Sequence, residues 1–496
     1  MNFRNSSFWI LVLFLSFLPI ASSIGALSTP KDFPFSLDLP LLLLGLGGIL
    51  SALLAIRPVF LLWFVTIFAL VVSGLIEYFL PSYWPVRWLA YVSAFVLFWP
   101  SLYAWIRRDP DKRAINARAL VYAGIAFLLI AAISTVRASP PVKQVVVATK
   151  SLLPFVGVYA FFAWYPLKNS SVRNWMKGVL CIGLIQIPLI LYQYFFIRAS
   201  RVARGQGAYA ADSVVGTMGG NPEGGGLSGA LAIFTVTLIL IILSFLKERE
   251  LSRRYAVAMV SILTLPLLFM EVKIIFFYLP VGLFVLYYST LKTRPKRFFR
   301  GLAVVVFILA AGIFAYQKLH WSASSSNVRG NLTKGFSYSF KSKPDSRKVG
   351  VLSRRGVIEY WWQQHRAGNL VDIIIGHGIG SSRVEGLIRG EMARKYEPKR
   401  IDRTGLGVFL WDTGVLGVTL LISIIVIGYL NLNTIRNRLD GWDRALARGL
   451  QSVFPLFILS FLYRNDIPYA APVMFTVMAS FGLVVWLGKK VGEKGN

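Results

Sequence analysis

The 496-residue chain has one cysteine, Cys181, and few acidic residues. A single cysteine excludes an intrachain disulfide and any zinc site built from cysteines. Charged residues make up only 15% of the chain, against about 25% in a typical soluble protein. The sequence also lacks a Walker-A motif and a dinucleotide-binding glycine motif. These shortages, together with long apolar runs, exclude a soluble globular domain.

The charge that is present is strongly basic, with 53 Lys and Arg against 22 Asp and Glu. Hydrophobic residues make up 56% of the chain, and the mean hydropathy is +0.61. The basic residues lie in short clusters between long apolar runs, which is the pattern of cytoplasmic loops under the positive-inside rule. A soluble nucleic-acid-binding protein would instead spread basic residues along its helices. We therefore expect a membrane protein that does not bind nucleic acid.

The apolar runs are long enough to cross a bilayer, which takes roughly 20 residues of helix. The sequence predicts an all-α polytopic membrane protein with about 14 transmembrane helices. The expected spans are 8–26, 37–55, 58–80, 85–106, 118–136, 143–164, 173–196, 224–246, 255–271, 274–291, 299–316, 405–431, 447–463 and 468–488. The ranges 255–271 and 274–291 also fit one long broken segment.

The distribution of basic residues predicts the orientation. With the N-terminus in the cytoplasm, the inner side holds 26 Lys and Arg, and the short outer loops hold 9. Short loops set orientation, whereas long loops contribute little. We therefore expect a multi-pass protein with both termini in the cytoplasm.

This topology divides the chain into four parts. N-terminal transmembrane helices occupy 1–136, and a transmembrane core with a basic outer loop at 197–226 occupies 137–316. A large extracytoplasmic loop at 317–404 carries 17 basic and 7 acidic residues and all three histidines. C-terminal transmembrane helices follow at 405–496. Within the large loop, the apolar spacing of 356–370 predicts an amphipathic helix.

Candidate binding residues gather at the outer face on this topology. Arg201 and Arg204 precede a glycine-rich stretch that begins at Gly216, and arginine forks and free backbone N–H groups both suit phosphate. Glu271 and Lys273 lie at the outer edge of two apolar spans, where charge is costly and usually lines a cavity.

The large loop and the following span add further candidates. Arg355 comes just before the predicted amphipathic helix, Glu359 lies in it, and His377 lies in a Gly-His-Gly-Ile-Gly turn. Arg403 comes just before a span that contains Asp412. An acid within a span needs a partner. Together these residues predict a cationic cavity for an anionic ligand, and at this depth a lipid-linked phosphate or pyrophosphate is the natural one.

The order of these features resembles the superfamily of O-antigen ligases and Wzy-type O-antigen polymerases, over about 140–430. The family's arginine-bearing outer loop and Gly-x-x-x-Asn-Pro stretch look like Arg201, Arg204 and the segment 216–222. Its basic residue at an outer span end looks like Lys273. Its later motifs look like Arg355, Trp361, Gly376, Gly378, Asp412, Gly414 and Gly417. The family's His-Asn pair falls here on Arg403 and Thr404, and arginine is a poor base because it stays protonated.

The resemblance implies a GT-C-like glycosyltransferase of the bacterial cytoplasmic (inner) membrane. It would polymerise undecaprenyl-pyrophosphate-linked oligosaccharide repeat units at the outer face, with no metal ion or other cofactor. Membrane lipids and a polysaccharide chain-length regulator would be its partners. We expect the pyrophosphate to bind the basic candidates Arg201, Arg204, Lys273, Arg355 and Arg403. The candidates for catalytic base are Glu271, Glu359 and His377.

Two alternatives stay open at this stage. A ligase would transfer the glycan to a lipid or protein acceptor, although Arg403 in the family's histidine position favours a polymerase. A transporter or flippase for lipid-linked glycans would bind the same headgroup. Transporters often have internal repeats with broken helices in matching halves, and no such symmetry is seen in this sequence.

Overall fold

The computed structural model describes residues 39–107, 118–204, 213–220, 227–270, 272, 274–296, 299, 351–366, 368–384 and 388–494. Over these ranges the chain is helical and forms no strand. Nine of its helices are long and apolar enough to cross a membrane. The prediction of an all-helical membrane protein is therefore confirmed. Helices suit this setting because each one satisfies its own backbone hydrogen bonds in lipid.

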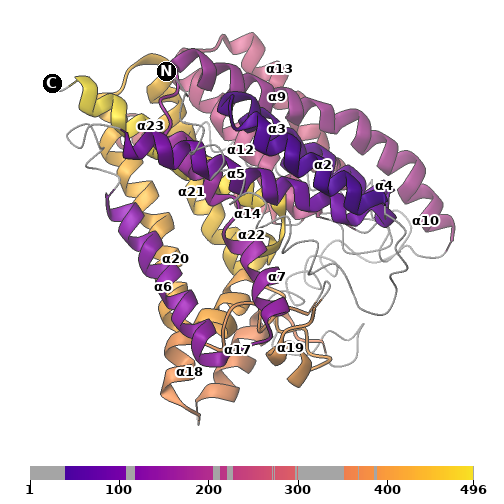
Figure 1. Cartoon of the computed structure of the whole chain (residues 1–496). Helices are drawn as coiled ribbons and strands as arrows, with labels where there is room; N and C mark the ends of the chain where they lie inside the picture. Colours follow the sequence, from indigo (N-terminus) through magenta and orange to yellow (C-terminus); the bar gives the residue numbers. More distant parts are fainter. Residues whose placement is uncertain are drawn as a thin grey trace.

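The α-helices follow the apolar runs of the sequence, and Figure 1 labels them along the chain. They are α2 Leu39–Leu54, α3 Pro58–Ile67, α4 Ser73–Phe79, α5 Trp88–Ile106, α6 Arg118–Ala138, α7 Val142–Leu152, α8 Val156–Trp164, α9 Asn169–Tyr192, α10 Ala199–Ala203, α12 Ser228–Lys247, α13 Arg253–Phe269, α14 Ile275–Thr293, α17 Arg354–His365, α18 Leu370–Ile375, α19 Glu391–Lys395, α20 Gly405–Ile435, α21 Gly441–Tyr463, α22 Asp466–Tyr469 and α23 Ala471–Lys494. Two π-helical turns, Phe68–Val72 and Gln193–Arg198, join α3 to α4 and α9 to α10.

Nine of the expected spans coincide with the nine long apolar helices. The expected span 143–164 is instead divided into α7 and α8 at Pro154, whose ring nitrogen has no hydrogen to continue a helix. The ranges 255–271 and 274–291 form two separate helices, α13 and α14. Span 37–55 becomes the shorter α2. The expected span 8–26 and all but residue 299 of 299–316 lie outside the described residues.

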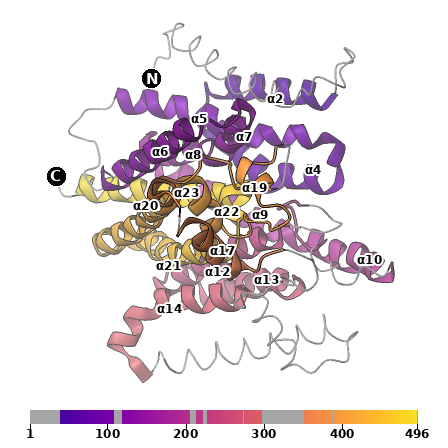
Figure 2. The ribbon, with the colours of Figure 1, turned by 90° about the horizontal axis from the view of Figure 1, so that it is seen from below.

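Helices α12, α21 and α23 form the centre of the bundle. Most of the apolar length of each is buried, whereas only 22% of α6 and of α14 is buried. Exposed apolar helices are the surface that a bilayer would cover. The helices of the large loop, α17, α18 and α19, lie together at the lower end of the molecule in Figure 1, and Figure 2 shows them from that end. The predicted helix 356–370 is found in part, because α17 ends at His365 and a separate helix, α18, begins at Leu370.

Helix α20 is broken at Gly414, where the backbone angles are φ 66° and ψ −169°. The break frees two carbonyl groups that an intact helix would use. The backbone N–H of His377 donates to the carbonyl oxygen of Trp411 at 2.8 Å. The hydroxyl of Ser134 donates to the carbonyl oxygen of Asp412 at 2.8 Å. The break in α20 therefore joins this span to α6 and to the large loop.

Replacing Gly414 by alanine is expected to destabilise the protein. These backbone angles are open essentially to glycine alone, and forcing another residue into them costs about 1–3 kcal/mol. A Cβ at Gly414 would also lie 2.4 Å from the carbonyl oxygen of Ile374. We expect a lower midpoint of thermal unfolding in detergent. Gly124→Ala is the control, because a Cβ there meets nothing within 4 Å. Equal unfolding midpoints for the two variants would contradict this account.

The non-helical segment 213–220 is fully buried between helices. Gln193 accepts hydrogen bonds from two of its backbone N–H groups, at 2.9 and 2.7 Å. Gln186 accepts one from the N–H of Thr217 at 2.8 Å. The hydroxyl of Thr217 donates to the carbonyl oxygen of Leu70 at 2.5 Å. Side chains thus supply the hydrogen bonds that irregular backbone lacks at membrane depth.

Candidate functional site

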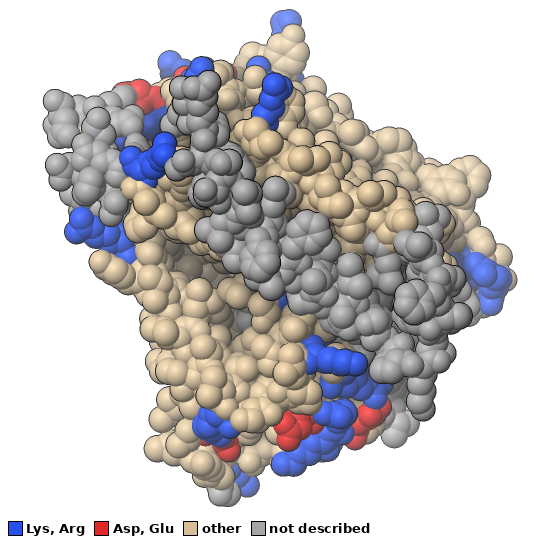
Figure 3. Space-filling view, viewed as in Figure 1, with Lys and Arg blue, Asp and Glu red and all other residues tan. Residues whose placement is uncertain are grey.

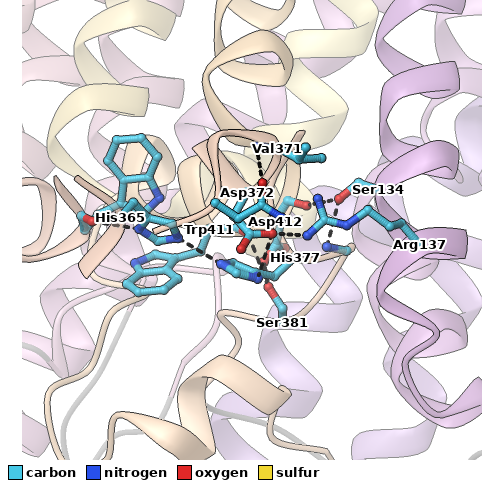
Figure 4. A network of polar contacts seen from close by, with 12 residues as sticks. Ser134, Arg137, His365, Val371, Asp372, His377, Ser381, Trp411 and Asp412 are labelled. Atoms are coloured by element: carbon cyan, nitrogen blue, oxygen red, sulfur yellow. Dashed lines mark hydrogen bonds and ion pairs between the residues drawn. The ribbon is translucent and has the colours of Figure 1, made fainter. Parts of the chain in front are cut away.

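The carboxylate of Asp412 holds the loop 376–384 in place (Figure 4). One carboxylate oxygen accepts the backbone N–H of Gly380 at 2.7 Å. The other accepts the N–H of Ser382 and the hydroxyl of Ser381, both at 2.9 Å. The side chain of Asp412 is buried in the break of α20. Because buried N–H groups need acceptors, this carboxylate fixes the path of the loop at 380–382, whereas the hydroxyl of Ser134 accepts the N–H of Gly378 at 2.8 Å.

The loop enters the break through Gly376, whose φ of 74° suits glycine. A Cβ there would lie 2.6 Å from the backbone nitrogen of Gly414. Two glycines therefore allow the loop and the broken helix to approach at van der Waals contact. His377 is the next residue of the loop, so this contact sets the position of its side chain.

The imidazoles of His365 and His377 face each other, with their Nε2 atoms 2.8 Å apart. Nδ1 of His365 lies 2.7 Å from the carbonyl oxygen of Trp361. That oxygen only accepts, so Nδ1 of His365 carries a proton. A neutral His365 then accepts at Nε2, and His377 donates from its own Nε2. The lone pair of a neutral His377 is left on Nδ1.

Nδ1 of His377 lies 4.0 Å from a carboxylate oxygen of Asp372 on α18. That same oxygen is paired with the guanidinium of Arg137 at the end of α6. Burial, and then His365, Arg137 and Lys395, lower the pKa of His377 to about 4. Burial and Lys395 also lower the pKa of His365. The histidine pair is therefore neutral near pH 7, with one nitrogen ready to accept a proton.

Aromatic rings enclose the histidine pair. The ring centroids of Trp361 and Trp411 each lie 4.9 Å from that of His365. The ring of Tyr396 packs against that of Trp411 at a tilt of 47°, with the centroids 5.2 Å apart. His365 and Trp411 are buried, whereas the side chain of His377 is 17% exposed. Among the described residues, the pair is therefore more open on the side of His377 than on that of His365.

Arg137→Gln is expected to raise the pKa of His377. The substitution removes a nearby positive charge and frees the carboxylate of Asp372 to stabilise a protonated imidazole. Neutral imidazole reacts with diethyl pyrocarbonate, and reaction is lost as the pH falls through the pKa. We expect this midpoint, read for His377 by mass spectrometry, to rise by at least one pH unit from about 4. Lys143→Gln, at an exposed site nearby, should leave the midpoint in place. An unchanged midpoint in Arg137→Gln would refute the assigned cause.

The predicted arginines of the outer loop lie elsewhere. Arg201 is buried in α10, and Arg204 is exposed and bonds Ser200 on its own helix at 3.3 and 3.4 Å. In Figures 1 and 2, α10 lies well apart from α17 and α18. The structure therefore does not bring Arg201 and Arg204 to the histidine pair.

The other predicted site residues are also separate from the pair or lie outside the described ranges. Arg355 and Glu359 form an ion pair with each other on α17, at 2.6 Å. Arg403 donates to the carbonyl oxygen of Leu352 at 2.5 Å. Glu271 and Lys273 lie outside the described residues. Of the three candidate bases, His377 is the one that the structure places in a buried polar network.

Sequence reasoning did not assign His365, Asp372, Arg137 or Ser134 to the site. These residues come from three separate segments, and neither motif nor periodicity links them. The one available signal was the histidine pair, because His365 lies in the predicted amphipathic helix and His377 follows it by 12 residues.

Basic side chains gather on one visible face at this end of the molecule (Figure 3). On the face shown in Figure 3, Lys and Arg gather at the lower end, with fewer Asp and Glu among them. The described residues thus define a multi-pass, helical membrane protein with a partly buried histidine pair between α17 and the loop 376–384. Neither a protein-family model nor a curated protein sequence matches the chain.

Proposed function

We propose that the protein is a membrane glycosyltransferase that polymerises lipid-linked oligosaccharides at the outer face of the bacterial cytoplasmic membrane. Its donor is an undecaprenyl-pyrophosphate-linked glycan, and its acceptor is a sugar hydroxyl of a second such glycan. The proposal includes a GT-C-like architecture with about 14 spans and both termini in the cytoplasm. Its support is the order of sequence features and the chemistry available at His377.

The neutral imidazole of His377 is the observation that carries the proposal. In the reaction, the acceptor oxygen bonds to the anomeric carbon, and the bond from that carbon to the pyrophosphate oxygen breaks. The hydroxyl proton passes to Nδ1 of His377, and the pyrophosphate leaves with the electron pair. Asp372, 4.0 Å from Nδ1, would stabilise the imidazolium that forms. Nearby Lys and Arg side chains would stabilise the leaving anion.

A weak base is enough for this reaction. Glycosyl transfer passes through a transition state in which the anomeric carbon is strongly positive. The attacking hydroxyl becomes more acidic as its bond to that carbon forms, so its proton can move late to a base of low pKa. A pKa of about 4 also keeps His377 unprotonated at any ordinary pH of the outer face.

The test is chain growth by the purified protein in liposomes that contain a lipid-linked repeat unit. We expect a ladder of products with increasing repeat number. Movement of labelled lipid between leaflets without chain growth would establish the transporter alternative instead. Transfer of a single glycan to an added non-identical acceptor, with no ladder, would establish a ligase.

A further inference from the structure

A second polar cluster lies beside the loop 376–384, where α7 packs against α5. The ammonium group of Lys150 on α7 lies over two aromatic faces, 4.3 Å from the ring centroid of Trp88 and 4.7 Å from that of Tyr91. Both rings are buried. Over the described part of the chain, Lys150 has no hydrogen-bond acceptor and no ion-pair partner. A partly buried ammonium with only ring faces for contacts has lost water without gaining a counter-ion.

The charged groups around Lys150 are mostly basic. Arg383, at the far end of the loop, donates to the carbonyl oxygen of Val147 one helical turn away, at 3.4 Å. Arg87, just before α5, lies near Lys150. The acidic neighbour of Lys150 is Glu77, and Glu77 forms an ion pair with Arg87 at 2.8 Å. Among the described residues, the charged neighbours of Lys150 are therefore two arginines and one glutamate, and Arg383 also lines a pocket with Asp412. Lysine within a membrane protein usually pairs with an acid or marks a binding site.

We propose that Lys150 and Arg383 form a binding site for a phosphate group. A phosphate has more than one negative charge, so it suits two adjacent cations better than a single carboxylate does. The three donors of the ammonium group are available, because aromatic faces attract its charge without using hydrogen-bond acceptors. The phosphate site is proposed from these contacts alone. The further step, that its phosphate belongs to the lipid-linked donor, rests on the proposed function.

The site is connected to the histidine pair through the loop. His377 is near one end of the loop, Arg383 is near the other, and Asp412 holds the residues between them. Gly380 packs against α7, where a Cβ would lie 2.7 Å from the Cβ of Ala148. The same short segment therefore positions a proton acceptor and a phosphate-binding cation.

Labelling with pyridoxal 5′-phosphate tests the site in the unmodified protein. The amine of a lysine attacks the aldehyde carbon, water leaves, and added borohydride reduces the imine to a stable secondary amine. We expect Lys150 to be labelled, and saturating inorganic pyrophosphate to lower that labelling at least fivefold. Pyridoxal without phosphate should label it at least fivefold less. Lys143, exposed on the same helix, should react equally under all conditions. Absent labelling at Lys150, or labelling that pyrophosphate does not change, would overturn the proposal.

Two further experiments identify the source of the phosphate and test whether Arg383 is the second cation of the site. Undecaprenyl phosphate added to nanodiscs should protect Lys150 as inorganic pyrophosphate does. Protection by the inorganic ion alone would show a site for free phosphate and remove the link to a lipid donor. In Arg383→Gln, the pyrophosphate concentration for half protection should rise at least tenfold, and in Arg389→Gln, at an exposed ion pair, it should not change. An unchanged value in Arg383→Gln would remove that residue from the site.

The outcome is separable from that of the proposed function. Protection of Lys150 together with an absence of chain growth would leave the phosphate site standing and remove the glycosyltransferase. Chain growth without protection of Lys150 would support the glycosyltransferase and remove the phosphate site.

Discussion

Asp412→Asn is expected to abolish chain growth, with a loss of at least about 100-fold, and to lower thermal stability. The carboxylate accepts hydrogen bonds from Gly380, Ser381 and Ser382. An asparagine side chain has one acceptor oxygen, and its amide nitrogen would face an N–H donor. Leaving a buried donor without an acceptor costs about 1–3 kcal/mol. The loop that carries His377 would then leave its position. Thermal unfolding and the chain-growth assay measure the two effects.

Thr413→Val is the matched control for Asp412→Asn. Its hydroxyl donates only to the carbonyl oxygen of Phe409 within the same helix, at 3.0 Å. Thr413 is a buried neighbour of Asp412, and valine has nearly the same size as threonine. The substitution leaves the contacts of the loop in place, so activity should stay within about threefold of the native protein. If Asp412→Asn has native activity and native thermal stability, Asp412 does not hold the loop.

His377→Gln is expected to lower kcat by about 10²–10⁴-fold, the usual contribution of a general base. KM should change little, because glutamine keeps a polar group of similar reach and removes only the proton acceptor. Measurement needs the dependence of initial rate on donor concentration. A rise in KM with an unchanged kcat would show that His377 binds substrate and accepts no proton.

His365→Gln separates positioning from chemistry at the pair. Its amide oxygen can still accept the N–H from Nε2 of His377, so the loss in kcat should be much smaller than for His377→Gln. Gln363→Ala, at an exposed position on the same helix, should have no effect. Equal losses in His365→Gln and His377→Gln would make the two histidines one functional unit rather than a base and its neighbour.

Much of the fold could be predicted from apolar length alone. A run of apolar residues long enough to span lipid forms a helix, because lipid offers no hydrogen-bond partners for its backbone. This accounts for helices such as α12 and α23. The amphipathic spacing of 356–370 likewise predicted α17. The interruption at Pro154 could also have been anticipated, since proline ends the hydrogen-bonding pattern of a helix.

Most of the site could not be predicted in the same way. The pairing of Arg137 with Asp372 joins residues 235 positions apart, and the bond from Ser134 to Asp412 spans 278. Such contacts depend on how helices pack, which periodicity does not encode. The pairing of Arg355 with Glu359 was within reach of the sequence. The two residues are four apart at the start of the predicted helix, a spacing that favours an ion pair between them.

The buried segment 213–220 has a consequence for how the protein is made. Its polar backbone relies on Gln186 and Gln193 from α9 and on Leu70 from the turn before α4. Before those helices meet, the segment has no partners in lipid and must stay in water. Insertion of the surrounding helices during synthesis therefore has to come first, with this segment sinking between them afterwards. All three partners precede the segment in the chain, so its packing depends on entry of the earlier helices and not on the last span.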